Sequence, residues 1–170
     1  MSEKSTRNDA ETFDVVVTRV VGTPVEEAWK AWSDPAYVTR WWGPTGFTSP
    51  SAEMDFRVGG ASLVCMRAPA EYGGQDMYHT WTYTTIEPHE RVGFVSNFAD
   101  KDGTHLDPAA LGMPPGIPHD VPHEITFEAT DFGTEMIVTE HGYTTEEARD
   151  LSKAGMEQCL DKMAAIFAAA

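Results

Sequence analysis

The chain ends in a long amphipathic helical pattern, which follows a stretch of alternating apolar and polar residues. After the capping sequence Thr144-x-x-Glu147, apolar residues recur at helical spacing as far as Phe167. Between Phe47 and His141 the hydrophobic period is two, and turn residues punctuate it. An antiparallel sheet with one apolar face needs a cover, and only the terminal helix is long enough to provide it.

The remaining elements complete an α+β architecture. Six strands are predicted in the alternating stretch, near residues 47–57, 61–67, 77–86, 91–98, 124–129 and 135–141. A valine-rich strand, 13–21, precedes them, and helix-start signals at Thr23-Pro24-Val25-Glu26 and Asp34-Pro35 predict two short helices after it. We therefore expect a seven-stranded antiparallel sheet covered by a long C-terminal helix, forming one domain over residues 13–170 behind a disordered tail at 1–12.

Composition and charge exclude several classes of protein. The chain has 12 basic and 27 acidic residues, a net charge of −15, and residues 87–150 carry 14 acidic and 3 basic residues and hence −11 of it. Such a surface repels phosphate, so nucleic acid and anionic membranes are not expected partners. An acidic face suits a basic protein partner, or it is solvated charge that keeps the protein soluble. With no apolar membrane span and no secretory signal, the cytoplasm is the expected location.

One segment interrupts the strand pattern. Residues 99–122 hold five prolines and no hydrophobic periodicity, and they are far longer than an ordinary connection. We interpret the segment either as a lid over a binding site or as a long mobile loop.

Several short motifs carry a resemblance to a known family. They are Ala31-Trp32-Ser33-Asp34-Pro35, Arg40-Trp41-Trp42-Gly43-Pro44, Thr18-Arg19, Ile86-Glu87-Pro88-His89-Glu90-Arg91-Val92, Gly133-Thr134 and Gly155-Met156-x-x-x-Leu160-x-x-Met163. With them, residues 13–167 resemble the heat-shock-90 ATPase activator homologues of the START-like, birch-pollen-allergen-like (SRPBCC) superfamily. The resemblance implies a helix-grip fold, in which a strongly curved sheet wraps the long helix. That superfamily includes lipid carriers, hormone receptors and aromatase/cyclases, so the fold alone does not fix a function.

Aromatic side chains are expected on the face of the sheet that meets the helix. Met77, His79, Trp81 and Tyr83 alternate along one strand and therefore share a face. The predicted ligand-binding residues are these four with Trp41, Trp42, Phe94, Phe98, Phe127, Met156 and Leu160. Together they describe an aromatic pocket with few polar groups, as small-molecule sites usually are. The alternative is that these residues form an ordinary packed core, in which either Trp41 or Trp42 is buried.

Two titratable groups are candidates for chemistry. His79 could hydrogen-bond a bound carbonyl or phenol, or act as a base, and its alternative is a structural histidine with a backbone or tyrosine partner. Glu140 shares a face with Met136 and Val138, so it is a partly buried carboxylate if that face points inward. Its alternatives are a position near solvent at the end of the strand and a pair with Arg19. If the protein is an enzyme, His79 with Glu140 or Tyr83 would supply the acid and base.

No cofactor or metal is predicted. His119 and His123 have an i, i+4 spacing, but Pro118 and Pro122 argue against a helix that would bring the two rings together. Nucleophile-elbow, phosphate-loop, dinucleotide and zinc-protease motifs are missing from the sequence. Cys65 and Cys159 have no cationic neighbour in sequence and are expected to pack inertly.

Three functions follow from these observations. The first is binding of a small hydrophobic, aromatic or polyketide-like molecule in a cavity between the sheet and the C-terminal helix. The second, implied by the family resemblance, is a co-chaperone role in which the acidic stretch 87–150 docks on a chaperone. The third is a cyclase- or hydrolase-type enzyme that uses the same cavity. A monomer and a homodimer are both compatible with the sequence.

Overall fold

The computed structural model describes residues 11–168. The predicted tail at 1–12 lies outside the described residues except for Glu11 and Thr12, which are exposed. In chain order the elements are β1 (Phe13–Val21), α2 (Val25–Ser33), α3 (Pro35–Trp41), β2 (Ala52–Glu53), β3 (Ala61–Arg67), η1 (Ala70–Tyr72), β4 (Asp76–Glu87), β5 (Arg91–Ala99), η2 (Pro108–Leu111), β6 (Val121–Thr130), β7 (Gly133–Tyr143) and α4 (Glu146–Ala168).

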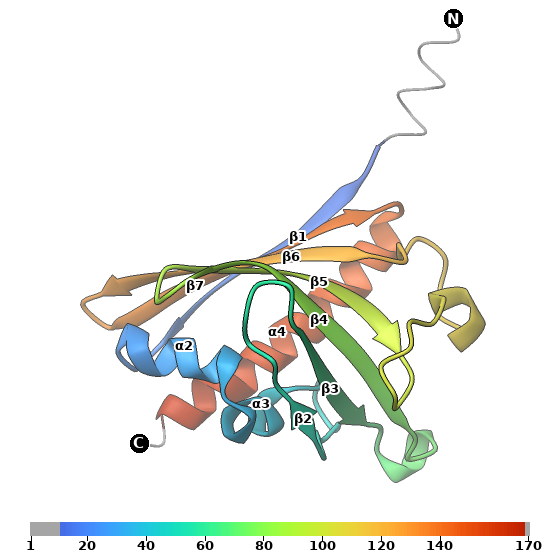
Figure 1. Cartoon of the computed structure of the whole chain (residues 1–170), viewed down its shortest axis with the longest axis horizontal. Helices are drawn as coiled ribbons and strands as arrows, with labels where there is room; N and C mark the ends of the chain where they lie inside the picture. The colour runs from blue at the N-terminus through green and yellow to red at the C-terminus, as the bar shows by residue number, and fades with distance from the viewer. Residues whose placement is uncertain (1–10, 169–170) are drawn as a thin grey trace, which may run out of the picture.

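The predicted fold class is confirmed. All seven strands form one antiparallel sheet in the order β1-β7-β6-β5-β4-β3-β2. The sheet curves around α4, while α3 contacts α4 and α2 contacts α3, β6 and β7 (Figure 1). We call the face of the sheet that meets α4 the inner face. Within residues 11–168 no helix is both long and apolar enough to span a bilayer.

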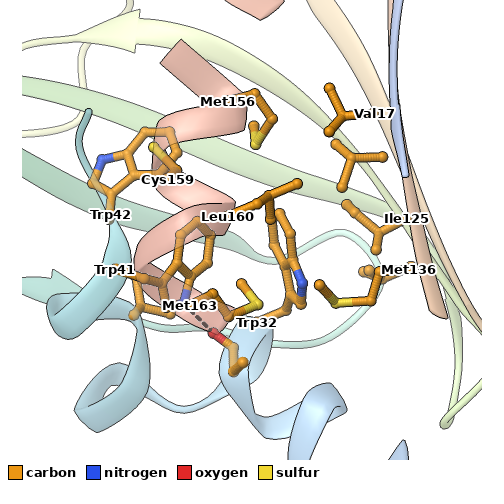
Figure 2. Packing of buried hydrophobic residues seen from close by; sticks show 14 of the residues in the cluster. Val17, Trp32, Trp41, Trp42, Ile125, Met136, Met156, Cys159, Leu160 and Met163 are labelled. Atoms are coloured by element: carbon orange, nitrogen blue, oxygen red, sulfur yellow. Dashed lines mark hydrogen bonds between the residues drawn. The ribbon is translucent and has the colours of Figure 1, made fainter. Parts of the chain in front are cut away.

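The strand register gathers the apolar residues on the inner face. Val17, Val138 and Ile125 lie opposite one another on β1, β7 and β6, and each is buried. Against them pack Leu160 of α4 and Trp32 of α2, in the cluster that Figure 2 shows. Burying one such aliphatic side chain contributes roughly 1.5–3 kcal/mol, so this layer is a main source of stability.

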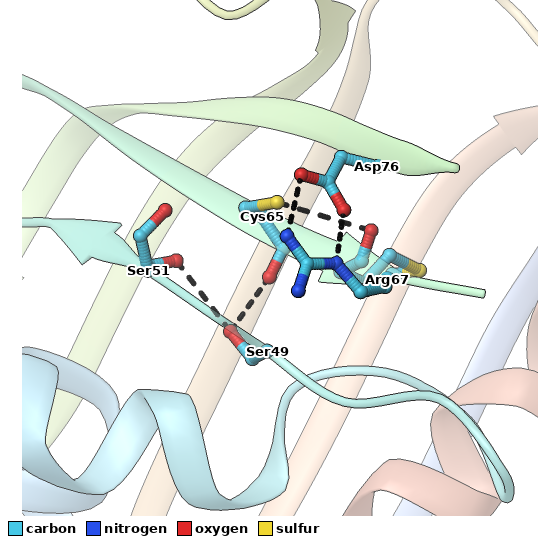
Figure 3. A network of polar contacts seen from close by, with 6 residues as sticks. Ser49, Ser51, Cys65, Arg67 and Asp76 are labelled. Carbon is cyan, nitrogen blue, oxygen red and sulfur yellow. Dashed lines mark hydrogen bonds and ion pairs between the residues drawn. The ribbon is translucent and has the colours of Figure 1, made fainter. Parts of the chain in front are cut away.

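The strand predicted over residues 47–57 is much shorter in the structure. Only Ala52–Glu53 forms β2, with an isolated bridge between Thr48 and Arg67 before it. Pro50 has no N–H for a ladder, and nearby the Ser49 hydroxyl donates to the Cys65 carbonyl (2.6 Å; Figure 3). Side-chain bonds therefore replace part of the predicted ladder at this edge of the sheet.

Two helix caps differ from the sequence prediction. α2 begins at Val25 with Pro24 before it, and no side-chain cap from Thr23 is formed. At α4 the cap lies one residue later than predicted, because the Ala148 N–H donates to Thr145 Oγ1 (3.0 Å). The predicted cap at Asp34 is present, where its carboxylate accepts the Ala36 N–H. Each difference moves a helix start by about one residue and leaves the fold unchanged.

The proline-rich segment crosses from the outer face of the sheet to the start of α4. His105 is hydrogen-bonded to Thr80, whose side chain lies on the outer face by strand alternation (3.1 Å). At the far end of the segment, the Thr144 N–H donates to the Gly116 carbonyl (2.9 Å). The segment is therefore anchored at both ends, and whether it acts as a lid stays a prediction.

Candidate functional site

A continuous row of rings lines the inner face. The His79 ring lies 4.6 Å from Phe98 and 5.6 Å from Trp42, and Trp42 lies 5.2 Å from Trp81. Trp81 stacks on Phe94 (4.8 Å), and Phe94 stacks on the ring of His123 (4.8 Å). These residues come from β4, β5, β6 and the end of α3. The inner face is therefore aromatic from Phe98, near the C-terminal end of β5, to the ring of His123.

The predicted ligand-binding residues separate into two groups. Met77, His79 and Phe98 are partly exposed at the start of β4 and the end of β5. The others are buried in the single hydrophobic cluster: Trp41, Trp42, Trp81, Tyr83, Phe94, Phe127, Met156 and Leu160. Both groups lie where the sequence places them, and their role in binding a ligand stays a prediction.

Glu140 is a buried carboxylate, with 2% of its surface exposed. Its Oε1 accepts hydrogen bonds from Tyr143 Oη (2.5 Å) and Ser152 Oγ (2.7 Å). Arg19, considered from sequence as its partner, forms an ion pair with Asp161 of α4 instead. Burying a carboxylate is costly unless it is hydrogen-bonded, and the two hydroxyl donors offset part of that cost.

His123 completes this polar group on the inner face. Its Nδ1 lies 2.9 Å from the Val121 carbonyl, which can only accept, so Nδ1 carries the proton. Its Nε2 lies 3.6 Å from Glu140 Oε2, and 9% of the side chain is exposed. We call Glu140, His123, Tyr143 and Ser152 the polar cluster.

Sequence reasoning placed His123 in a candidate metal pair and missed Tyr143 and Ser152. The alternation of His123 with Ile125 and Phe127 carried the signal, but Pro122 led to a strand starting at Glu124 rather than Val121. Ser152 offered no signal, because its partner lies on β7 and depends on how α4 packs there.

His79 stands at the end of the aromatic row away from His123 and is uncharged at neutral pH. Burial, together with a smaller effect of the charge on His123, lowers its pKa to about 4. Its buried Nδ1 has no hydrogen-bond partner among the described residues, and the same holds for the indole Nε1 atoms of Trp42 and Trp32. Buried polar atoms are nearly always paired, so these nitrogens of His79 and Trp42, whose rings are in contact, need an explanation.

Other predicted chemical groups lie apart from this site. Tyr83 shares a hydrogen bond with Ser62 on β3 (2.7 Å), and burial raises the pKa of Tyr83 to about 12. It is therefore placed with Ser62 rather than with Glu140. Burial also raises the pKa of Cys159 to about 12, which favours the inert thiol.

No metal site emerges in the part of the chain that the structure describes. His119 lies beside Asn97 and Asp120, whereas His123 points to the inner face, so the two imidazoles do not converge. Within residues 11–168 no three His, Cys, Asp or Glu side chains are grouped to hold an ion.

Two surface hollows accompany the inner site. One, of about 440 Å³, lies between the β4 and β5 ends and the proline-rich segment, and of the predicted ligand-binding residues Met77 and Phe98 line it. The other, of about 490 Å³, lies between the start of α2 and the β6–β7 turn. Neither is lined by α4, so a cavity between the sheet and α4 stays a prediction.

The fold and its inner face define a helix-grip protein of the START-like SRPBCC class. Within that class, the chain belongs to the Activator of Hsp90 ATPase homolog 1-like protein family, whose model matches residues 22–168. This confirms the resemblance that the tryptophan and glycine motifs carry.

Solved structures with the same fold come from several bacteria. A Chromobacterium violaceum protein is 26% identical with a TM-score of 0.73, and the match covers 91% of this chain and 96% of that one. The AHSA1 protein of Silicibacter pomeroyi is 22% identical with a TM-score of 0.72, covering 92% and 98% of the two chains. A protein from Arthrobacter aurescens is 25% identical with a TM-score of 0.71, covering 96% and 89%. No curated protein sequence gave a significant match.

Proposed function

We propose that the protein binds a small, mainly apolar and aromatic molecule between the inner face of the sheet and α4. The observation that carries the proposal is the aromatic row that ends at a buried polar cluster. Binding sites for small molecules combine apolar walls with a few polar groups that fix orientation. A core built for stability alone has no need of a buried Glu140, because apolar residues of similar volume fill such positions at no net cost.

The surface of α4 supports the same location. Gly155 lies on α4 between Ser152, which donates to Glu140, and Cys159, whose thiol contacts the backbone of Gly43. A Cβ added at Gly155 would meet no atom within 4 Å. The space beside this glycine is therefore open, and no close neighbour requires it. We propose that the glycine keeps room for part of the ligand.

Native mass spectrometry of the purified protein is the first test, because a bound small molecule adds a defined mass. A second test follows the fluorescence of the five tryptophans during titration with a panel of apolar aromatic compounds. Gly155→Leu fills the open space and is expected to abolish the quenching, whereas Leu151→Ala, at an exposed position of the same helix, leaves it unchanged. If no compound quenches and no mass copurifies, the proposal is wrong.

The family description supports a second proposal, docking on a chaperone. The acidic stretch 87–150 would be the contact, and a charge-driven contact weakens as salt screens it. A pull-down with a heat-shock-90 chaperone is expected to retain the protein at low salt and to release it at high salt. No retention at low salt would rule this function out. A cytoplasmic location and a monomeric or homodimeric state stay predictions.

A further inference from the structure

We propose that the ligand is a neutral hydroxyaromatic molecule whose hydroxyl group bridges Trp42 and His79. This inference rests on the proposed ligand-binding function and narrows it to one chemical class. It starts from the two buried nitrogens, Trp42 Nε1 and His79 Nδ1, that have no hydrogen-bond partner among residues 11–168. Their rings are adjacent, with centroids 5.6 Å apart and planes at 87°.

The hydrogen-bonding capacity of the two nitrogens selects a hydroxyl group. An indole Nε1–H can only donate, whereas the Nδ1 of a neutral imidazole donates or accepts according to its tautomer. A hydroxyl oxygen accepts from Trp42, and it either accepts from His79 or donates its own proton to it. A carbonyl oxygen fits only one of the two tautomers. The hydroxyl is therefore the group that satisfies both nitrogens in either state.

The charges around the site disfavour an anionic ligand. Glu140 is buried at the other end of the aromatic row, and His79 supplies no positive charge at neutral pH. Two cations that lie near α4 are already engaged: Arg19 pairs with Asp161, and Lys162 Nζ donates to the Phe47 carbonyl (2.9 Å). A carboxylate would lose its hydration without gaining a cationic partner.

The rings around Trp42 and His79 favour a ligand whose hydroxyl group is attached to an aromatic ring. Trp81 meets Trp42 edge to face at 5.2 Å, and Phe98 lies 4.6 Å from His79. A flat ring bearing the hydroxyl would contact these faces in the edge-to-face or offset arrangements that aromatic groups prefer. An aliphatic alcohol would fill the same volume with fewer such contacts.

The test uses three probes on one ring system: 2-naphthol, 2-methylnaphthalene and 2-naphthoate. Calorimetric titration at pH 7 measures each dissociation constant on the unmodified protein, so no variant has to fold. We expect 2-naphthol to bind roughly tenfold more tightly than 2-methylnaphthalene, because it makes the added hydrogen bonds, and 2-naphthoate to bind more weakly than either.

Two tryptophan variants locate the hydroxyl group. Trp42→Phe keeps a ring but removes the Nε1–H, and it is expected to weaken 2-naphthol roughly fivefold while leaving 2-methylnaphthalene unchanged. Trp32→Phe is the matched control, since its Nε1 also has no partner in the described part of the chain but no aromatic contact joins its ring to His79. It should leave the preference for 2-naphthol intact.

Each other outcome is decisive. Equal affinity for 2-naphthol and 2-methylnaphthalene would overturn the hydroxyl inference while supporting the ligand-binding function. Tightest binding of 2-naphthoate would overturn it in favour of an anion site. If none of the three probes binds, the hydroxyaromatic class is wrong, and a copurifying mass in native mass spectrometry then decides separately whether the protein binds another ligand.

Discussion

Two consecutive tryptophans show how the two ends of the interior differ. Trp41 is fully buried, and its Nε1 donates to the Ala31 carbonyl (2.7 Å). That carbonyl needs the indole because the residue four positions later is Pro35, which has no N–H to donate. Trp42 is 8% exposed, and within residues 11–168 its Nε1 has no partner.

The environments of the two indoles differ in the same way. Trp41 packs on Trp32 (4.6 Å), within the apolar cluster that also holds Leu160 and Met163 (Figure 2). Trp42 packs against His79, at the end of the aromatic row away from the polar cluster. We call these regions the Trp41 end and the Trp42 end. The first end also holds one unpartnered nitrogen, Trp32 Nε1, whereas the second holds two on neighbouring rings, Trp42 Nε1 and His79 Nδ1. We therefore expect the first end to contribute mainly to stability and propose the second as the place where a ligand binds.

The largest expected effect tests the packing of the Trp41 end. Leu160→Ala removes a fully buried side chain and is expected to lower the free energy of unfolding by about 2–5 kcal/mol. The control is Leu151→Ala on the same helix, where the leucine is 52% exposed and the expected change is within about 0.5 kcal/mol. Urea unfolding at pH 7 measures both. A cost below about 1 kcal/mol for Leu160→Ala would show that this end is not the tightly packed one.

The second prediction concerns pH at the Trp42 end. Because the pKa of His79 is about 4 in the folded protein and about 6.5 when unfolded, the unfolded state takes up the proton first as pH falls. The contribution of His79 to stability is present above about pH 6.5 and is lost as pH falls towards 4, by up to about 3 kcal/mol.

Unfolding curves of the wild type and His79→Leu between pH 7 and pH 4 isolate this contribution. The difference in free energy of unfolding between the two proteins should change across that window. If the free energies of unfolding of the two proteins stay a constant distance apart, His79 titrates alike in both states, and the Trp42 end is open to water rather than buried.

Sequence patterns predicted the Trp41 end better than the Trp42 end. Helical spacing placed Leu160 and Met163 on one face of α4, and strand alternation placed Val17, Val138 and Ile125 on the inner face. Both patterns are local, and burial follows them directly. The seven-stranded sheet and its covering helix followed from the same periodicities.

The polar cluster depends on contacts that no local pattern encodes. Glu140 and His79 were identified by alternation, but whether Glu140 paired with Arg19 or with Ser152 depended on the position of α4 across the sheet. His123 was not assigned to a strand, because Pro122 precedes it and the predicted strand began at Glu124. The lack of a partner at Trp42 Nε1 is a property of the packed structure, and the residue type alone does not indicate it.

The third prediction compares the two indoles directly. Trp41→Phe leaves the buried Ala31 carbonyl without its donor and is expected to destabilise the protein by about 1–3 kcal/mol. Trp42→Phe removes a donor that has no partner in the described structure, so its cost is smaller than that of Trp41→Phe. Both substitutions remove the same atoms, and thermal or urea unfolding of the ligand-free protein measures the difference. If Trp41→Phe and Trp42→Phe lower the free energy of unfolding equally, the two indoles do not differ in their contribution to stability.

The smallest expected effect tests whether the space beside Gly155 serves stability or binding. Glycine within a helix costs about 1 kcal/mol relative to alanine, and an added Cβ would meet nothing within 4 Å. Gly155→Ala is therefore expected to raise the free energy of unfolding by up to about 1 kcal/mol. Gly155→Leu places a larger side chain in the proposed ligand space and should block the ligand. Gain of stability with loss of binding would separate the two roles at one position, whereas destabilisation by alanine would show that the helix needs the glycine for packing.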